Sequence, residues 1–345
     1  MTAATRVLAA MSGGVDSSVA AALLRDAGYD VTGVTLKLWG GASDSGCCSA
    51  ADVEDARRVA AQLDIPHYVF NFTDDFDQRV VAPYVDAYAD GRTPNPCVEC
   101  NRSIKFGRLL ERADALGFDA VATGHHARVD RDDEGRWALR RGTDAAKDQS
   151  YVLYMLGQAE LSRTLLPVGE LTKARVREHA ARLGLRTAAK PESMDVCFIT
   201  RGDRERFVAE RAGARPGAVV DPAGAVVGAH EGVTGFTIGQ RRGVGVATGE
   251  RRYVVDLDAP TATVVLGRRD DLLRDCAELR DLRFVDGPPA LDARIDVQVR
   301  AHGTPVPGRL DGTCVRFDRP QPRVAPGQVV ALYDADTLLG GGIAT

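Results

Sequence analysis

The stretch "LAAMSGGVDSSVAA", residues 8–21, places Ser12, Gly13 and Gly14 between an apolar run and a helical pattern. Glycines let the backbone turn tightly, and the first turn of the following helix offers free N–H groups and a positive dipole end to an anion. The stretch lacks the Gly-Lys-Ser/Thr of a Walker loop and the G-x-G-x-x-G of a dinucleotide fold. A plain strand-to-helix turn with a serine cap is the alternative. The residues of this turn alone are compatible with both: a phosphate-binding turn in an α/β domain and a plain capped turn.

Apolar runs alternate with helical patterns from Arg6 to about Ile199. Strands and helices of these lengths predict an α/β fold with a doubly wound parallel sheet covered on both faces. Beyond Arg201 the chain turns to short alternating runs separated by Gly and Pro, which are typical of β-strands. We therefore expect a catalytic domain over residues 1–200, a central β-rich adaptor over 201–270 and a β-barrel over 271–345.

The composition excludes some functional classes. The chain has 345 residues, of which 44% are hydrophobic and 27% charged, so ordinary globular domains are expected. No apolar run approaches the roughly 20 residues that cross a bilayer, and the first residues do not make a signal-peptide core. We expect a cytoplasmic protein with no membrane partner. The formal charge of −4 gives no overall basic field, so any nucleic acid must be held by local patches.

Seven cysteines without an export signal favour thiol chemistry over structural disulfides. Cys97 and Cys100 lie in "NPCVECN", and Cys197 lies in "ESMDVCFI". The spacing of the first two suits a metal, a redox pair or a nucleophile. Sulfur transfer needs one thiol to carry a persulfide and a second to release it, and three such cysteines can meet that need. The others are expected to be packing residues: Cys47, Cys48, Cys276 and Cys314.

The string "SGGVDS" resembles the pyrophosphatase (PP) loop of enzymes that adenylate a substrate with ATP and release pyrophosphate. Other motifs narrow the resemblance: "GRTPNPCVECNRSIKF", "ATGHH", "KDQSYVLY", "MDVCFI", "FTIGQRRGVG" and the terminal "GGGI". With these motifs in order over residues 11–343, the chain resembles the tRNA-specific 2-thiouridylase family. That family thiolates the wobble uridine (U34) of tRNA at position 2, so the resemblance implies a tRNA-uridine 2-sulfurtransferase.

The resemblance implies a chemistry and its residues. ATP, with Mg²⁺, would adenylate uridine O2; sulfur from a Cys197 persulfide would replace the adenylate, and Cys100 would act as the resolving nucleophile, giving 2-thiouridine, AMP and pyrophosphate. The expected partners are the tRNA anticodon loop and a sulfur donor such as a cysteine desulfurase or a sulfur-relay protein. The implied nucleotide contacts are Ala10, Met11, Ser12, Gly13, Gly14, Val15, Asp16, Ser17, Leu36 and Gly124. The implied tRNA contacts are Asn95, Pro96, Cys97, His125, Lys147, Asp148, Gln149, Arg300 and Gln328.

Two positions depart from the family pattern. The best-known form of the family has an acidic residue where Cys97 stands, and often a tyrosine where Ala301 stands. Cys97 also opens a second mechanism, because Cys97, Cys100 and Cys197 could hold three corners of a [4Fe–4S] cluster whose fourth iron binds sulfide.

Two other functions are compatible with parts of the sequence. An ATP-dependent amidating ligase would share the loop but would use ammonia and have no need of these thiols. A non-catalytic tRNA-binding protein would have no need of an intact loop.

Overall fold

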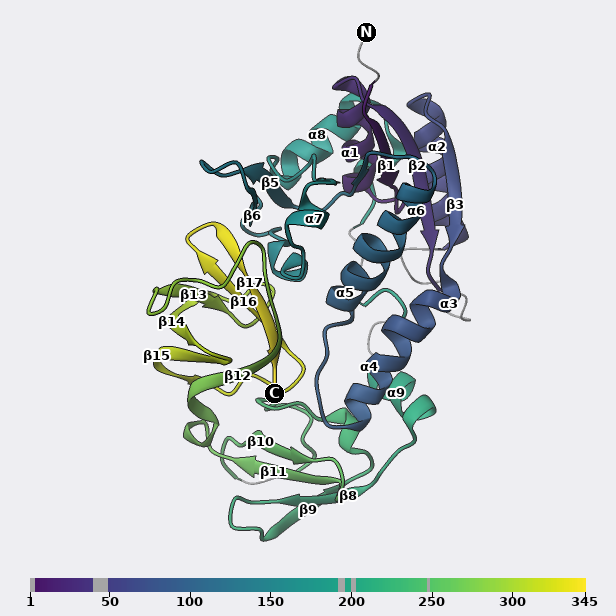
Figure 1. Ribbon diagram of the computed structural model, residues 1–345. Helices are drawn as coiled ribbons and strands as arrows, with labels where there is room; N and C mark the ends of the chain where they lie inside the picture. Colours follow the sequence, from purple (N-terminus) through teal and green to yellow (C-terminus); the bar gives the residue numbers. More distant parts are fainter. Residues whose placement is uncertain (1–3, 40–48, 192–195, 200–202, 247–248) are drawn as a thin grey trace.

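The computed structural model describes residues 4–39, 49–191, 196–199, 203–246 and 249–345. Figure 1 shows an N-terminal α/β part, a small β part built from β8–β11, and a barrel beside both. Cys47 and Cys48, for which we expect packing roles, lie outside the described residues. Among the described helices, none combines the length and apolar character that a membrane crossing requires.

The N-terminal part contains a parallel sheet in the order β3-β2-β1-β4-β7. Its strands are β1 (Arg6–Ala10), β2 (Asp30–Lys37), β3 (His67–Asn71), β4 (Ala120–Ala122) and β7 (Thr164–Leu165). Neighbouring strands are parallel throughout, so the predicted doubly wound α/β class is confirmed. The loop after β1 therefore opens at the carboxyl edge of the sheet, where such folds bind ligands.

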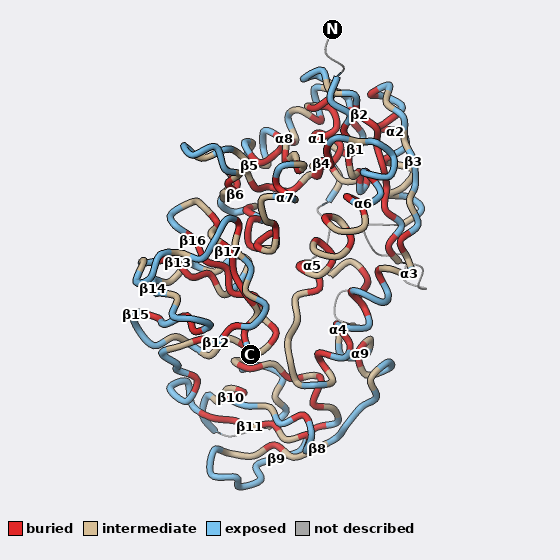
Figure 2. The backbone as a smooth tube through the Cα atoms, in the orientation of Figure 1, coloured by how far each residue is buried: buried red, intermediate tan, exposed pale blue. Residues whose placement is uncertain are grey.

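The alternation of side chains along β1 sends its apolar residues into two cores. Val7 and Ala9 pack with α1 (Val15–Asp26), α2 (Ala50–Gln62) and α8 (Lys173–Arg182) on one face. Leu8 packs on the other face, in a core that continues into barrel residues such as Tyr333. That face is covered by α3 (Thr73–Phe76), η1 (Asp77–Val81), α4 (Ala82–Ala89), α5 (Pro96–Glu99), η2 (Cys100–Arg108) and α6 (Leu109–Ala115). Figure 2 shows buried backbone running through the sheet, these helices, and β16 and β17.

The β-rich remainder forms two modules, as expected. After η3 (Ser150–Leu153), α7 (Gln158–Leu161), η4 (Arg186–Ala189) and α9 (Arg204–Ala212), a sheet in the order β10-β11-β8-β9 forms. Its elements are β8 (Gly217–Val220), β9 (Val226–His230), η5 (Val233–Gly235), β10 (Tyr253–Asp258) and β11 (Thr263–Gly267). The second module follows η6 (Asp270–Leu272) and contains β12 (Leu273–Phe284), β13 (Ile295–Gln298), β14 (Val306–Asp311), β15 (Cys314–Pro322), β16 (Val329–Asp334) and β17 (Thr337–Ala344). Because β12 pairs with both β15 and β17, these strands close into a barrel.

A hairpin from the N-terminal part extends the barrel sheet. It consists of β5 (Ala127–Arg131) and β6 (Trp137–Arg141), and β6 pairs with the start of β17. Arg140 faces Thr337 and Leu139 faces Leu338 in this pairing. We did not expect the hairpin, because its charged sequence lacks a long apolar run. It joins the first and last parts of the chain through a strand pair.

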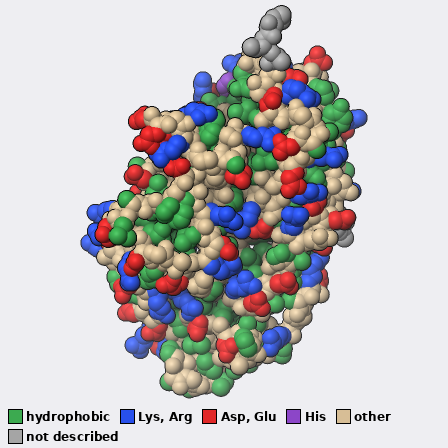
Figure 3. All heavy atoms as spheres, viewed as in Figure 1, with side chains coloured by type: hydrophobic (Ala, Val, Ile, Leu, Met, Phe, Trp, Pro, Cys, Tyr) green, Lys and Arg blue, Asp and Glu red, His purple; other side chains and the backbone are tan. Residues whose placement is uncertain are grey.

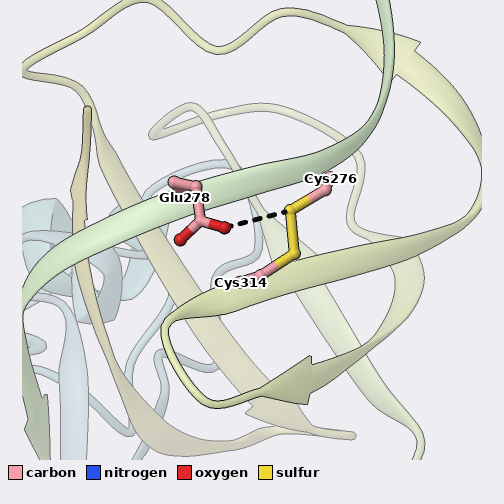
Figure 4. Close-up of side chains that lie close together, drawn as sticks. All are labelled: Cys276, Glu278 and Cys314. Carbon is pink, nitrogen blue, oxygen red and sulfur yellow. Dashed lines mark hydrogen bonds between the residues drawn. A yellow bond between two sulfur atoms is a disulfide. The ribbon is translucent and has the colours of Figure 1, made fainter.

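The expectation of no structural disulfide is wrong. Cys276 and Cys314 form a disulfide between the adjacent strands β12 and β15, with their Cα atoms 6.1 Å apart, and Glu278 lies beside the bond (Figure 4). Cys314 is buried, as expected of a packing residue, whereas Cys276 is only half-buried. The register of β12 against β15 brings the two residues together, and the sequence does not reveal a strand register.

Candidate active site

The turn after β1 is held by its own serines. Ser12 N donates to Ser17 Oγ at 3.1 Å, and Ser18 Oγ donates to Gly14 O at 2.7 Å. Gly14 is the N-cap of α1, and its position has no side-chain cap hydrogen bond. The amide groups of this helix start are therefore not covered by a capping side chain, as an anion site requires.

Gly13 packs directly on the start of α2. It has φ +72°, and a Cβ on it would lie 2.3 Å from Asp52 O, so only glycine fits. Lys190 Nζ closes the contact by donating to Gly13 O at 3.0 Å, to Asp52 Oδ1 at 2.6 Å and to Asp55 Oδ2 at 2.8 Å. The turn is thus braced from behind by α2 and by the residue that follows η4.

Asp16, in the first turn of α1, is the half-buried centre of a charge cluster. Lys173 Nζ donates to both Asp16 oxygens, at 2.8 Å and 2.6 Å, and His126 Nε2 lies 3.0 Å from Oδ1. Burial raises the pKa of Asp16, but the hydrogen bonds with His126 and Lys173 outweigh it and leave the pKa below its ordinary value. Asp16 is therefore an anion held beside a lysine at the mouth of the turn.

A cavity of about 390 Å³ lies in front of this cluster. It brings together several of the expected nucleotide residues with Cys97, Cys100 and Cys197, although Cys197 lies about 100 residues after the other two cysteines in sequence. Gly124, just after β4, also borders the cavity. A Cβ on this residue would lie 2.6 Å from Ser17 N. The nucleotide residues along the wall are Ala10, Met11, Ser12, Asp16, Ser17, Leu36 and Gly124. Gly13, Gly14 and Val15 shape the turn without being part of that lining.

Cys97 lines the cavity from α5, which begins at Pro96, and Cys100 lines it from the position directly after that helix. Asn95, an expected tRNA contact, is the N-cap of α5, and its Oδ1 accepts a hydrogen bond from Cys97 N at 3.1 Å. Cys100 is buried and begins the π-helical segment η2. π-Helical turns are rare and occur frequently at functional sites.

His125 is buried in the cavity wall as a neutral ring. Its Nδ1 lies 2.7 Å from Thr123 Oγ1, and the Phe106 ring packs against it. Burial, together with the nearby charges of Lys105 and His126, holds the pKa of His125 well below its usual range. An uncharged imidazole in the cavity that the three cysteines also line can donate a hydrogen bond to a base or accept one from it.

The other expected tRNA residues take different positions. Lys147, Gln149 and Pro96 line the cavity, and Arg300 is exposed on the barrel. Asp148, by contrast, is buried, and its oxygens accept hydrogen bonds from Gly142 N, Ser150 N and Arg141 Nη1. Gln328 Nε2 donates to Thr93 O at 2.6 Å, so the barrel supports the loop that leads to Cys97.

The three cysteines do not surround a single metal ion. Among the described residues, three Cys, His or acidic ligand atoms within 4.8 Å of one another occur only at Cys276, Glu278 and Cys314, where the sulfurs are already bonded to each other. A cluster is a different case, because its cysteines bind different irons. Three sulfur ligands on one cavity wall are compatible in kind and number with a cluster that keeps one open iron.

Sequence reasoning missed three residues of this site. The motifs assign no role to His126, yet it contacts Asp16 while it is buried; they do not point to Lys173 or Lys190 either. The sequence does contain a signal for Lys173: it stands in the first turn of the helix that follows "ELT". The start of that helix lies at the same edge of the sheet as the loop, so the lysine brings a positive charge there. Lys190 follows α8 by several residues, and its contact with Gly13 depends on the three-dimensional fold.

Together these features define an α/β protein in which the glycine-rich turn between β1 and α1, of the kind that binds phosphates, opens onto a cysteine-lined cavity. Three family models match in succession: a tRNA methyl transferase HUP domain over residues 5–201, a tRNA methyl transferase PRC-barrel domain over 205–268 and an aminomethyltransferase beta-barrel domain over 274–344. The chain is 51% identical to the tRNA-specific 2-thiouridylase MnmA of Chloroflexus aggregans, with 97% of both chains covered. It is 47% identical to the protein of the same name from Moorella thermoacetica, with 97% of this chain and 98% of that protein covered.

The chain belongs to the tRNA-specific 2-thiouridylase family. Among solved structures, the U34-tRNA thiolase NcsA from Methanococcus maripaludis with its [4Fe-4S] cluster matches with a TM-score of 0.38 and 17% identity, over 60% of this chain and 63% of that one. A match at that level does not bear on the chemistry of this chain.

Proposed function

We propose that this enzyme uses ATP to replace O2 of the wobble uridine of tRNA with sulfur. The observation that carries the proposal is that the loop around Asp16 and the cysteines Cys100 and Cys197 line one cavity. An adenylating site and a sulfur-transfer pair must act on the same base in turn, so they must share a cavity. The family membership supports the same substrate.

ATP is bound, on this proposal, with its phosphates at the start of α1. The open helix N-terminus and Lys173 supply positive charge, and the half-buried Asp16 carboxylate suits Mg²⁺, which in proteins is held by one or two carboxylates plus phosphates. Mg²⁺, when bound, neutralises charge on the phosphates. Uridine O2 attacks the α-phosphate, the bond to the β-phosphate breaks, the N3 proton is lost, and pyrophosphate leaves.

Sulfur transfer follows at C2. The terminal sulfur of a Cys197 persulfide attacks C2, and AMP leaves with the former O2. Cys100 then attacks Cys197 Sγ, which releases 2-thiouridine and leaves a Cys100–Cys197 disulfide for a dithiol reductant. Cys197 is half-buried whereas Cys100 is buried, so Cys197 is the better placed of the two to receive sulfur from a desulfurase or relay protein.

The uridine enters from an anticodon loop, because single-stranded bases can be turned out into a pocket. Lys147 and Gln149 on the N-terminal part and Arg300 on the barrel are the proposed contacts with the RNA around it. Figure 3 shows basic and acidic side chains interspersed over the visible face, which fits a binding surface made of local groups.

A cluster-dependent variant rests on one observation, that Cys97 lines the cavity with Cys100 and Cys197. These residues would hold a [4Fe–4S] cluster, whose open iron would supply bound sulfide. Iron and acid-labile sulfide, measured on protein purified without oxygen, distinguish the two: about four irons per chain support the cluster, and active iron-free protein supports the persulfide route.

The proposal is tested by Cys100→Ser and Cys197→Ser in a thiolation assay with a tRNA transcript, ATP and a persulfide donor. Both variants should bind tRNA and form pyrophosphate but make no 2-thiouridine. An amidating ligase would instead turn over with ammonia and be indifferent to Cys197, and a tRNA-binding protein would not cleave ATP.

A further inference from the structure

Arg141, at the end of β6, is the hub of a polar network between the N-terminal part and the barrel. Its Nη1 donates to Asp148 Oδ2 at 3.0 Å and to Gln298 Oε1 at 2.8 Å, and its guanidinium carbon lies 3.6 Å from the centre of the Tyr333 ring. Tyr333 and Gln298 are buried barrel residues on β16 and β13. One side chain of the N-terminal part therefore contacts two barrel strands.

On the N-terminal side the network fixes residues 147–149. Asp148 Oδ1 accepts from Gly142 N and Ser150 N, each at 3.0 Å, so its carboxylate is fully engaged. The next residue, Gln149, donates its N–H to His126 O at 2.9 Å and accepts from His126 N at 3.0 Å. Through His126 this segment reaches Asp16 of the nucleotide loop.

On the barrel side the network fixes the turn after β13. Gln298 Nε2 donates to Arg300 O at 3.0 Å and to Ala301 O at 2.9 Å. The next residue, His302, lines the cavity. The buried amide thus holds the backbone from which the exposed Arg300 side chain projects.

We propose that Arg141 is a positioning residue that holds residues 147–149 and residues 300–302 in one arrangement, so that both contact the same tRNA. This inference rests on the proposed function, because it assumes that the two segments bind RNA. Arg141 suits the task because a planar guanidinium can stack on a ring while it bonds two acceptors, which an ammonium cannot do. Its contribution is to binding geometry, since it makes no proposed contact with substrate.

The chain offers a matched control in the neighbouring residue. Arg140 crosses the same junction, where its Nη1 donates to Asp336 Oδ1 at 3.2 Å and to Thr337 Oγ1 at 2.6 Å. It contacts neither Asp148 nor Gln298 in the hydrogen bonds of the described residues. Arg140→Ala therefore weakens the junction without touching the network.

The experiment measures the Kd of an unmodified tRNA transcript and of ATP for wild type, Arg141→Ala, Arg141→Lys and Arg140→Ala, at a temperature where circular dichroism shows each variant folded. We expect Arg141→Ala to weaken tRNA binding roughly tenfold, within the range for networked side chains. Arg141→Lys should recover part of the loss, and Arg140→Ala should bind tRNA like wild type. The Kd for ATP should change in none of them.

Gln298→Leu provides a second route if Arg141→Ala does not fold. It should weaken tRNA binding, and combining it with Arg141→Lys should add little to the larger single effect, because both act in one network. Equal losses in Arg140→Ala and Arg141→Ala, or wild-type tRNA affinity in both Arg141→Ala and Gln298→Leu, would overturn the inference. Failure of the wild-type protein to bind tRNA would instead contradict the proposed function.

Discussion

Lys173 Nζ lies 2.6 Å from Asp16 Oδ2, at the point where the first turns of α8 and α1 meet. Both side chains face the cavity, and the lysine side chain is only 13% exposed. On the proposed function, Asp16 would hold Mg²⁺ and the Lys173 ammonium would bind a phosphate oxygen. The pair therefore gives the nucleotide loop a cation that the loop sequence does not contain.

Replacing Lys173 should weaken ATP binding through the phosphates alone. We expect Lys173→Ala to raise the Kd of ATP by roughly 10- to 100-fold, as for the loss of a charged hydrogen bond, and to leave the Kd of adenosine, which has no phosphate, nearly unchanged. Calorimetry without tRNA measures both. Arg175→Ala, on the exposed side of the same helix, is the control. Equal weakening of ATP and adenosine binding would assign Lys173 a structural role.

The Gly13 contact predicts a sharp difference between neighbouring glycines. Gly13→Ala places a Cβ 2.3 Å from Asp52 O at positive φ, whereas a Cβ on Gly14 would meet Ser12 Oγ at an ordinary 3.5 Å. The left-handed backbone alone costs about 1–2 kcal/mol, and the overlap adds to it. Gly13→Ala should lower the midpoint temperature of thermal unfolding and raise the Kd of ATP, whereas Gly14→Ala should change both quantities little. Similar unfolding temperatures and ATP affinities in the two variants would contradict the inference that α2 supports the turn at Gly13.

Cys97 separates the two sulfur routes. On the persulfide route Cys97→Ser should retain thiolation, because Cys100 and Cys197 suffice. On the cluster route the variant should lose iron and activity together, since a ligand is gone. Iron content and thiolation, measured on the same oxygen-free preparation, decide between them. Loss of thiolation without any iron in the wild type would require a third role for Cys97.

The neutral His125 should make stability fall in mild acid. Its pKa is lowered in the folded protein, so below about pH 6.5 the unfolded chain binds the proton that the folded one refuses, and stability declines as pH falls. Between pH 7.5 and 5.5 the loss amounts to about 1.4 kcal/mol if the ring stays neutral. Urea unfolding at both values should show a smaller decline in His125→Gln than in wild type; equal declines would contradict the assignment. His67, whose pKa is also lowered, contributes equally to both proteins.

Much of the N-terminal fold could be predicted because its signals are local. A window of about a dozen residues is enough to recognise the glycine–serine turn, the helix α2 with its Ser49 cap, and the apolar strands. The π-helical start at Cys100 could not be anticipated, because that stretch differs from an ordinary helix by its hydrogen bonding alone. The β5–β6 hairpin could not be anticipated either, because its partner β17 lies about 200 residues away in sequence.

The site divides in the same way. Cys97, Cys100 and the loop residues were found from motifs, whereas Lys173, His126 and Lys190 became visible only when the fold brought them to Asp16 and Gly13. Asp148 is one of the tRNA contacts that the resemblance implies, and the structure shows that its carboxylate is buried in the Arg141 network.

The most direct test is mass spectrometry of nucleosides from a tRNA transcript incubated with the enzyme, ATP, Mg²⁺ and a persulfide donor, with AMP and pyrophosphate measured in the same reaction. The account predicts one 2-thiouridine at the wobble position for each AMP and pyrophosphate formed, and no 2-thiouridine with Cys197→Ser. ATP cleavage without 2-thiouridine, or 2-thiouridine that persists in both Cys100→Ser and Cys197→Ser, would contradict it.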